Sequence, residues 1–269
     1  MGDLPVKETI PRQGTLSRGL AIMDTLLSAM QPMSLIEIAE SVGLEQSTTL
    51  RLLRSLEENR QLIRLGDGKK YCCSPHALRP LSLLHPLEQL RRETSPMLSS
   101  LSRELANSVV LVIYLGIERL VVDVGLSPGT LNPYYNSWLQ GPLHGSGPGK
   151  ALLLTVDEPR RRQLLGPEPY RRYTQHTLTS WAEVSADLKI AEERGYAVVR
   201  DEFYQGLSAI SCNFRSWSGR MAGCFAVTGH TRDMTDDGVE RIGREILRIA
   251  GLMPLQASSL GIIDSFCGY

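Results

Sequence analysis

The stretch VGLEQSTTLRLLRSLEENRQLIRLGDGKKY, residues 42–71, decides the fold of the N-terminal region. Gly43 supplies a turn, and a helical run begins near Gln46 or Ser47. Apolar side chains recur on one side of this run at helical spacing: Leu50, Leu53 and Leu56. Polar side chains fall on another side at i, i+4, i+7 and i+11: Ser47, Arg51, Arg54 and Glu58. We therefore predict an amphipathic helix with a basic, hydroxyl-bearing outer face.

Two helices are predicted before this run and a hairpin after it. Residues 18–31 have helical periodicity, and Ser34 with Glu37 forms a capping box for a short second helix. Residues 62–65 and 71–73 are predicted strands, joined by a glycine-bracketed turn that carries two lysines. Helix, helix, turn, helix and hairpin, in this order, are typical of a winged helix-turn-helix.

The third helix and the wing carry side chains that suit DNA. Hydroxyl groups bond base edges or phosphates, arginine pairs with guanine or phosphate, and wing lysines suit phosphate. Residues 47–71 hold six basic and three acidic side chains, a charge of +3 in a chain of zero formal net charge. For any single arginine the alternative is an ordinary solvated surface charge. The candidate DNA-binding residues are Arg18, Ser47, Thr48, Thr49, Arg51, Arg54, Lys69 and Lys70.

The composition is that of an ordinary globular protein. Its 269 residues are 42% hydrophobic and 22% charged, which allows a sizeable core and favours two domains. The N-terminus lacks the apolar segment of a signal peptide, and the apolar runs are too short to cross a bilayer, so we expect a cytoplasmic protein with no membrane partner. Five cysteines without CxxC spacing suit a reducing compartment and indicate no zinc site. We expect neither a cofactor nor a metal.

Beyond Ser74 the pattern changes from a helical segment to long strands. Pro80 and Pro86 should break or kink the helical run that follows Ser74, so we place the domain junction there. β-rich runs and turns then predict strands at 109–115, 119–126, 196–201, 207–214 and 220–229. The turn HGSGPGKALLLTV leads into a helix, and further helices are predicted after Asp157, after Ser180 and from about Asp237 to Met253. This pattern favours a mixed α/β unit with an antiparallel sheet.

The chain resembles IclR-type bacterial transcriptional regulators from Leu16 to about Leu252. The N-terminal match comprises LSRGLAIMDTLL and LIEIAESVGLEQSTTLRLLRSLEE, and the C-terminal match PLHGSGPGKALL, RGYAVVRDEFYQGLSAIS and GCFAVTG. The resemblance implies an α+β fold with a winged helix-turn-helix domain, a linker helix and a GAF-like antiparallel-sheet effector domain. The expected boundaries are an N-terminal arm 1–14, the DNA-binding domain 15–74, the linker helix region 75–90, the effector domain 91–254 and a C-terminal tail 255–269. It also implies a homodimer or homotetramer on double-stranded operator DNA.

The resemblance further implies an effector pocket between the sheet and the glycine-rich turn. Carried over position by position, the pocket residues are Gly147, Pro148, Ala209, Ala226 and Thr228. Many members have cysteine or serine where this chain has Ala209 and Ala226, and Val199 stands where an acidic residue is usual. Fewer donors leave fewer ways to hold a small carboxylate, because a buried ionised acid needs hydrogen bonds.

A larger or aromatic effector is therefore expected, contacted by aromatic residues of the loop 127–142. The candidates are Tyr134, Tyr135 and Trp138. The alternative for these rings is a lid that packs on the domain's own core or on a partner subunit.

The predicted function is a sequence-specific DNA-binding transcriptional regulator, repressor or activator, controlled by a small-molecule aromatic or organic-acid effector of catabolism. The alternative is a metabolite-sensing module that acts through protein contacts without DNA. An enzyme is not expected: HGSGPGKA lacks the first glycine and the final Ser or Thr of a phosphate-binding loop. His144, Asp201, Glu202 and Cys212 have no catalytic signature; His144 is expected to order its own turn, and Asp201 and Glu202 to be solvated or to cap backbone.

Overall fold

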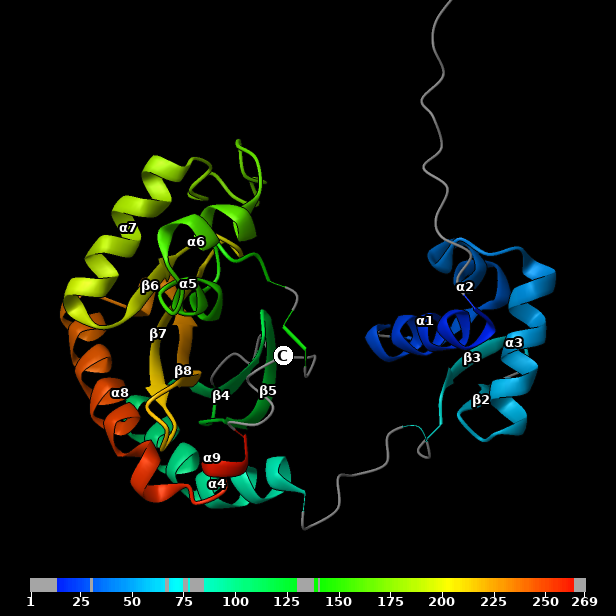
Figure 1. Cartoon of the computed structure of the whole chain (residues 1–269), viewed down its shortest axis with the longest axis horizontal. Coiled ribbons are helices and arrows are strands. Elements are labelled where there is room, and N and C mark those ends of the chain that lie inside the picture. Colours follow the sequence, from blue (N-terminus) through cyan, green and yellow to red (C-terminus); the bar gives the residue numbers. More distant parts are fainter. Residues whose placement is uncertain are drawn as a thin grey trace, which may run out of the picture. The chain divides into compact units, whose positions relative to one another are not determined.

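The computed structural model describes residues 14–29, 31–65, 68–74, 77, 85–129, 138–139 and 141–263. The chain divides into two compact units between Pro80 and Leu81 (Figure 1). One unit is mainly helical with a small three-stranded sheet, and the other is built on a five-stranded antiparallel sheet. The predicted α+β class is confirmed.

The N-terminal unit has the predicted helices and hairpin in the predicted order, together with one short strand, β1, that was not predicted. Its elements are α1 (Thr15–Ser28), β1 (Met33–Ser34), α2 (Leu35–Val42), α3 (Gln46–Glu58), β2 (Leu62–Leu65) and β3 (Lys70–Cys73), with the strands in the order β1-β3-β2. Ser34 and Glu37 form the predicted capping box, and Gly43 ends α2 in the left-handed conformation with φ 65°. A turn at positive φ favours glycine because it has no Cβ to clash. The helix-turn-helix and the β2–β3 hairpin are therefore confirmed.

One apolar cluster holds this unit together. Its buried members come from all three helices and from both strands of the hairpin: Ile22, Leu26, Ile38, Leu52, Leu53, Leu62 and Tyr71. A fully buried leucine or isoleucine contributes roughly 1.5–3 kcal/mol. The apolar side of α3 is thereby fixed against α1 and α2, and its polar side is left facing solvent.

The C-terminal unit is organised around a sheet with strand order β5-β4-β8-β7-β6. Its strands are β4 (Ser108–Leu115), β5 (Glu118–Gly125), β6 (Ala197–Arg200), β7 (Leu207–Arg215) and β8 (Met221–His230). Each neighbouring pair is antiparallel. Alternate side chains of a strand point to opposite faces, so every strand contributes to two different layers.

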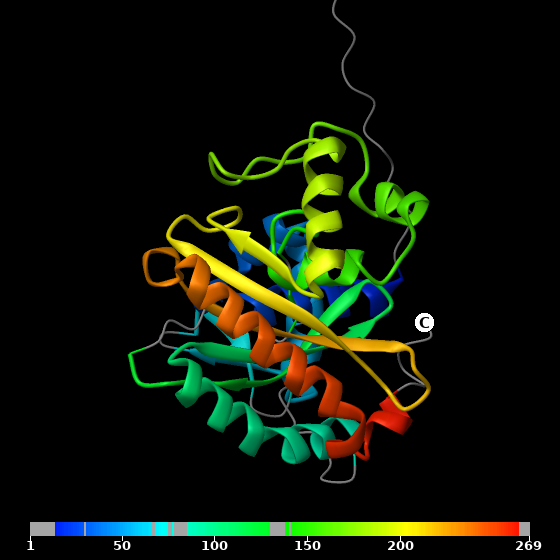
Figure 2. The ribbon, with the colours of Figure 1, turned by 90° about the vertical axis from the view of Figure 1, so that its left-hand side faces the viewer.

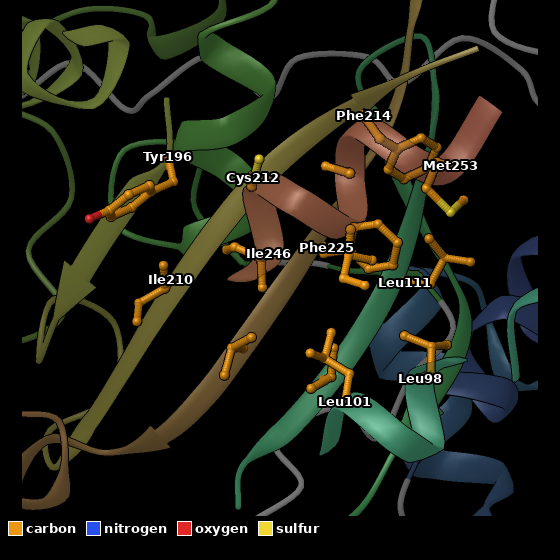
Figure 3. Packing of buried hydrophobic residues seen from close by; sticks show 14 of the residues in the cluster. Leu98, Leu101, Leu111, Tyr196, Ile210, Cys212, Phe214, Phe225, Ile246 and Met253 are labelled. Carbon is orange, nitrogen blue, oxygen red and sulfur yellow. The ribbon is translucent and has the colours of Figure 1, made fainter. Parts of the chain in front are cut away.

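Helices cover both faces of this sheet (Figure 2). On one face α4 (Pro86–Leu105), α8 (Asp236–Gln256) and α9 (Leu260–Ile263) enclose the largest apolar cluster, with Phe214 and Phe225 at 5.4 Å (Figure 3). On the other face α5 (Gly147–Leu153) packs on β4 and β8 side chains, and α6 (Glu158–Leu165) and α7 (Trp181–Arg194) adjoin it. A short 3₁₀ helix, η1 (Thr231–Asp233), follows β8. No helix of the described residues has the length and apolarity that crossing a membrane requires.

Two expected boundaries differ from the structure. Pro86 is the first residue of α4 rather than a break in a helix, because the first helical position needs no backbone N–H donor; Pro80 lies outside the described residues. Leu90 is fully buried in the sheet unit, so residues 86–90 belong to the second unit and not to a linker. The expected tail also begins too early, because α8 runs to Gln256 and α9 follows it.

The beginning of that expected tail is part of the core. Ala257, Leu260 and Ile263 are fully buried in the α4–α8 layer. The hydroxyls of Ser258 and Ser259 each donate to the Glu93 carboxylate at 2.6 Å. These bonds tie the segment to α4.

Candidate functional sites

The outer face of α3 presents the polar side chains that the periodicity predicted. Ser47, Arg51 and Arg54 are exposed, and Thr48 is half-buried. Because these residues fall within two turns of one helix, they form a single basic, hydroxyl-bearing surface. α3 is the second helix of the helix-turn-helix, the element that enters the major groove in proteins of this architecture.

Thr49 does not share this surface. Its side chain is fully buried, and its hydroxyl donates to the carbonyl oxygen of Glu45 at 3.0 Å. Consecutive residues of a helix are rotated by about 100° about the axis, so three successive hydroxyl residues do not face one way. We therefore withdraw Thr49 from the candidate DNA contacts.

The wing places further cations near one another. Lys70 lies in β3 opposite Leu65 and Ser34, and both Lys69 and Lys70 are exposed. Arg64 of β2 is paired with Glu57 at 2.8 Å, so part of the local positive charge is already neutralised. Arg18 lies in the first turns of α1 and is half-buried.

The predicted effector residues on the strands come together under α5. Ala209 of β7 lies opposite Thr228 of β8, and Ser211 lies opposite Ala226. A Cβ on Gly147 would overlap the Ser211 hydroxyl and lie 3.1 Å from the Ala209 Cβ, so the glycine allows the turn to sit directly on β7. Ser211 was missed, although it shares the period-2 face of Ala209.

The other predicted effector residues are less closely grouped. Pro148 is buried in the first turn of α5. Trp138 forms an isolated bridge with Leu120 of β5, and its side chain is 43% exposed. Tyr134 and Tyr135 lie outside the described residues.

Lys150 of α5 is a fully buried cation that sequence reasoning overlooked. Its Nζ donates to Asp187 of α7 and to Glu202 at 2.7 Å each. Glu202 was expected to be solvated, but it is buried, and desolvation raises its pKa to about 7 although Lys150 opposes the shift. The Lys150 ion-pair cluster (Lys150, Asp187 and Glu202) therefore joins the glycine-rich turn to the segment after β6.

Arg119, at the start of β5, is a second buried cation that was missed. Its guanidinium donates to the carbonyl oxygens of Leu139 and Gly141 and to the hydroxyl of Ser146, the N-cap of α5. Burial lowers its pKa. An arginine beside a turn carries no sequence signal of burial, because exposure is the usual outcome for this residue type.

Tyr114 and Asn213 form a hydrogen-bonded pair on the α5 side of the sheet. Tyr114 lies opposite Arg119, and its hydroxyl donates to the side-chain oxygen Oδ1 of Asn213 at 2.7 Å. The Asn213 amide in turn donates to the carbonyl oxygen of Ala151. Burial raises the pKa of Tyr114, so this phenol serves as a neutral donor. The face under α5 thus combines apolar and polar groups.

The four residues considered for catalysis do not form one site. Cys212 faces the α4–α8 layer, whereas Glu202 is bonded to Lys150 on the α5 side. His144 Nε2 donates a hydrogen bond to the carbonyl oxygen of Arg171 at 3.0 Å, outside its own turn. Asp201 accepts from the Gly206 backbone N–H and caps its loop. The described residues contain no group of three or more His, Cys, Asp or Glu placed to hold a metal.

Comparison with known families agrees with both units. The description "Bacterial transcriptional regulator IclR C-terminal" matches residues 84–252, more than half of the chain, and "IclR helix-turn-helix domain" matches residues 15–65. The chain belongs to the IclR family of bacterial transcriptional regulators. The first described helix, the wing strand β2 and the whole sheet lie within these matches.

Individual relatives cover nearly the whole chain. The transcriptional repressor IclR of Escherichia coli K12 is 26% identical over 255 residues, which is 93% of each chain. An IclR transcriptional regulator from Alicyclobacillus acidocaldarius shares the fold with a TM-score of 0.72 at 21% identity, covering 97% of this chain and 100% of that one. An IclR homologue from Microbacterium hydrocarbonoxydans, crystallised with 4-hydroxybenzoate, has a TM-score of 0.72 at 18% identity, with coverages of 94% and 99%. The first two of these relatives are described as a transcriptional repressor and a transcriptional regulator.

Proposed function

We propose that this IclR-family regulator reads operator DNA in the cytoplasm through the outer face of α3. The observation that carries the proposal is the joint exposure of Ser47, Arg51 and Arg54 on the second helix of the helix-turn-helix. Arg51 and Arg54 can each donate two parallel hydrogen bonds to guanine O6 and N7 or to phosphate. Thr48 and Arg18, with the wing residues Lys69 and Lys70, are the proposed supporting contacts.

Binding to DNA from upstream of the gene and its neighbouring operon tests this role. Fluorescence anisotropy compares that duplex with a scrambled one at matched, near-physiological salt, since phosphate contacts make all affinities salt-dependent. We expect tight binding to the native duplex alone, and its loss in the Arg51→Ala/Arg54→Ala variant. Arg241→Ala, an exposed arginine of α8, is the matched control. A double variant that still regulates its genes normally would favour the sensor that acts without DNA.

We further infer that a small organic or aromatic acid binds the face under α5 and shifts the protein between two arrangements. Gly147, Pro148, Ala209, Ala226 and Thr228 are the residues proposed to line this site, with Trp138 and the loop tyrosines as additional contacts. A ligand changes DNA affinity only if it binds the two arrangements unequally. Because a protein of this fold was crystallised with 4-hydroxybenzoate, hydroxybenzoates belong in the first screen.

We also propose a homodimer or homotetramer as the working unit. Two recognition helices, one from each subunit, suit paired half-sites about one helical turn apart. α1 offers an apolar stripe for association, because Leu16 is 76% exposed and Leu20 is 56% exposed. Light scattering of wild type and Leu20→Glu checks this: a smaller assembly in the variant supports the α1 contact, and an unchanged mass contradicts it.

A further inference from the structure

Arg119 is buried among neutral groups. Its side chain is only 7% exposed, and its bonds go to Leu139 O at 3.2 Å, Gly141 O at 2.6 Å and Ser146 Oγ at 3.2 Å. Within the part of the chain that the structure describes, no carboxylate is paired with it. A buried charge is ordinarily paired with its opposite, because removal from water costs far more than neutral acceptors return.

Part of the donor capacity of this guanidinium is unused. A guanidinium carries five N–H donors, and three bonds to described groups are formed here. The Nε–H is buried and has no acceptor among the described residues. Such unused donors are rare in native structures, and an acceptor from outside the chain, a water or a ligand, would satisfy this one.

A second buried polar atom without a described partner lies beside the same turn. Ser211 Oγ of β7 is fully buried and forms no hydrogen bond with the described residues. It directly faces Gly147, and Gly147 follows Ser146, the residue to which Arg119 donates. The two unsatisfied groups therefore adjoin consecutive residues of one turn.

We propose that Arg119 binds the carboxylate of a small organic monoacid, with the Ser211 hydroxyl as a second polar contact to the same ligand. This inference rests on the proposed effector site under α5 and deepens it by naming the groups that hold the acid and by limiting the acid to one carboxylate. A guanidinium donates charge-assisted hydrogen bonds to a carboxylate and compensates its charge in the same step. One uncompensated cation matches one carboxylate, so a second carboxylate on the ligand would itself be buried without a partner.

The other side chains on this face determine which non-acidic part of a ligand would fit. Apolar side chains form a buried cluster on the same face of the sheet: Val110, Val112, Leu152, Cys224 and Ala226. The arrangement therefore favours an acid with an apolar or aromatic body. Because alanine occupies positions 209 and 226, the sequence predicted few hydrogen-bond donors for a carboxylate. Arg119 of β5 would supply donors that those two positions lack.

The test compares acids with their amides on the full-length protein. Isothermal titration calorimetry measures Kd for benzoate, 4-hydroxybenzoate and hexanoate, and for benzamide, 4-hydroxybenzamide and hexanamide. Wild type should prefer at least one acid over its amide by roughly 10- to 100-fold, because hydrogen bonds to charged groups are the stronger class. Arg119→Gln should bring that ratio close to one, and Arg119→Lys should leave an intermediate ratio.

The ratio separates ligand binding from a merely structural role. If Arg119 only held the turn, Arg119→Gln would weaken acid and amide equally and leave the ratio unchanged, which would overturn the proposal. Wild type that binds none of the acids would also overturn it. Arg194→Gln is the matched control, because Arg194 is another partly buried arginine with an unpartnered Nη2 among the described residues; it should keep the wild-type ratio. Ser211→Ala should weaken the preferred acid several-fold, and unchanged affinity would remove Ser211 from the site.

Anisotropy with operator DNA in the same samples distinguishes failure of the carboxylate site from failure of the proposed DNA-binding role. Specific DNA binding that responds to a neutral compound but to no acid would retain the effector site and reject the carboxylate. An acid preference that depends on Arg119, in a protein without specific DNA binding, would retain the carboxylate site and reject the proposed DNA role.

Discussion

The two units place their important cations in opposite environments. In the N-terminal unit Arg51, Arg54 and Lys70 project into solvent from α3 and β3, whereas in the C-terminal unit Arg119 of β5 and Lys150 of α5 are buried. Exposed charges retain their hydration and contribute little to folding. Buried charges are stable only when other groups replace the lost water.

The buried cations themselves differ in their partners. Lys150 is matched by two carboxylates of its own chain, Asp187 and Glu202, whereas Arg119 has only carbonyl and hydroxyl acceptors among the described residues. The first arrangement compensates the charge of Lys150 within the protein and serves the fold, although Glu202 Oε2 has no hydrogen-bond partner among the described residues. The exposed cations and Arg119 have binding capacity left for a partner. Stability and ligand binding should therefore respond separately to substitutions in these regions.

The largest expected effect is on folding, from Lys150→Met. Removing the cation leaves Glu202 buried without its partner, which should cost about 3–5 kcal/mol of unfolding free energy. Urea denaturation followed by circular dichroism measures this. Lys189→Met, on the exposed side of α7, is the matched control and should stay within about 0.5 kcal/mol of wild type.

A compensating substitution sharpens the interpretation. Lys150→Met/Glu202→Leu should recover part of the lost stability, because an apolar pair can replace a buried ion pair. A Lys150→Met protein as stable as the Lys189→Met control would show that the cluster does not hold α5.

The next effect concerns pH and Glu202. Desolvation raises its folded pKa to about 7 from the ordinary value of 4.5, so the folded state binds the extra proton between these values. Its contribution to stability is therefore full below pH 4.5 and is lost as pH rises through 7, by on the order of 3 kcal/mol in total at about 1.36 kcal/mol per unit. Glu202→Gln, which does not titrate, should gain that amount relative to wild type between pH 5 and pH 8.

The comparison with the variant is needed because His144 acts in the opposite direction. Burial lowers its pKa, so its contribution to stability increases as pH rises toward the ordinary value of 6.5. Both proteins contain His144, so subtracting the pH profile of unfolding free energy of Glu202→Gln from that of wild type removes the His144 contribution. Parallel curves would show that Glu202 keeps its charge at all these pH values, fully compensated by Lys150.

A smaller effect, on DNA binding alone, is expected from Arg51→Ala. If Arg51 reads a guanine, the variant should lose about 1–3 kcal/mol of binding free energy and discriminate less at one operator position. Its unfolding free energy should change by less than about 0.5 kcal/mol, since the side chain is exposed. Anisotropy over single-base operator variants measures the discrimination. A loss that is equal for all sequences would make Arg51 a phosphate contact.

Local patterns were sufficient to predict the elements, but not the buried charges. The capping box at Ser34 and the turn at Gly43 each depend on neighbouring residues, and both were predicted. Lys150 obtains its carboxylates from residues 37 and 52 positions later in the chain, and Arg119 is enclosed by carbonyls some twenty positions away. A single sequence does not reveal which distant segments enclose a charge. Thr49 was an avoidable error, since helical rotation alone turns it away from Ser47.

The smallest predicted effects compare these two hydroxyl residues. Thr49→Ala removes buried atoms and should lower the unfolding free energy by about 1 kcal/mol while leaving the DNA sequence preference unchanged. Ser47→Ala should do the reverse, with unchanged stability and a loss of roughly 0.5–1.5 kcal/mol in DNA binding, the size of one neutral hydrogen bond. Denaturation and anisotropy on both variants check the pair. A changed operator preference in Thr49→Ala would mean that α3 contacts DNA with a different face. The buried Thr49 side chain, whose hydroxyl donates to the carbonyl oxygen of Glu45, does not reach a base edge.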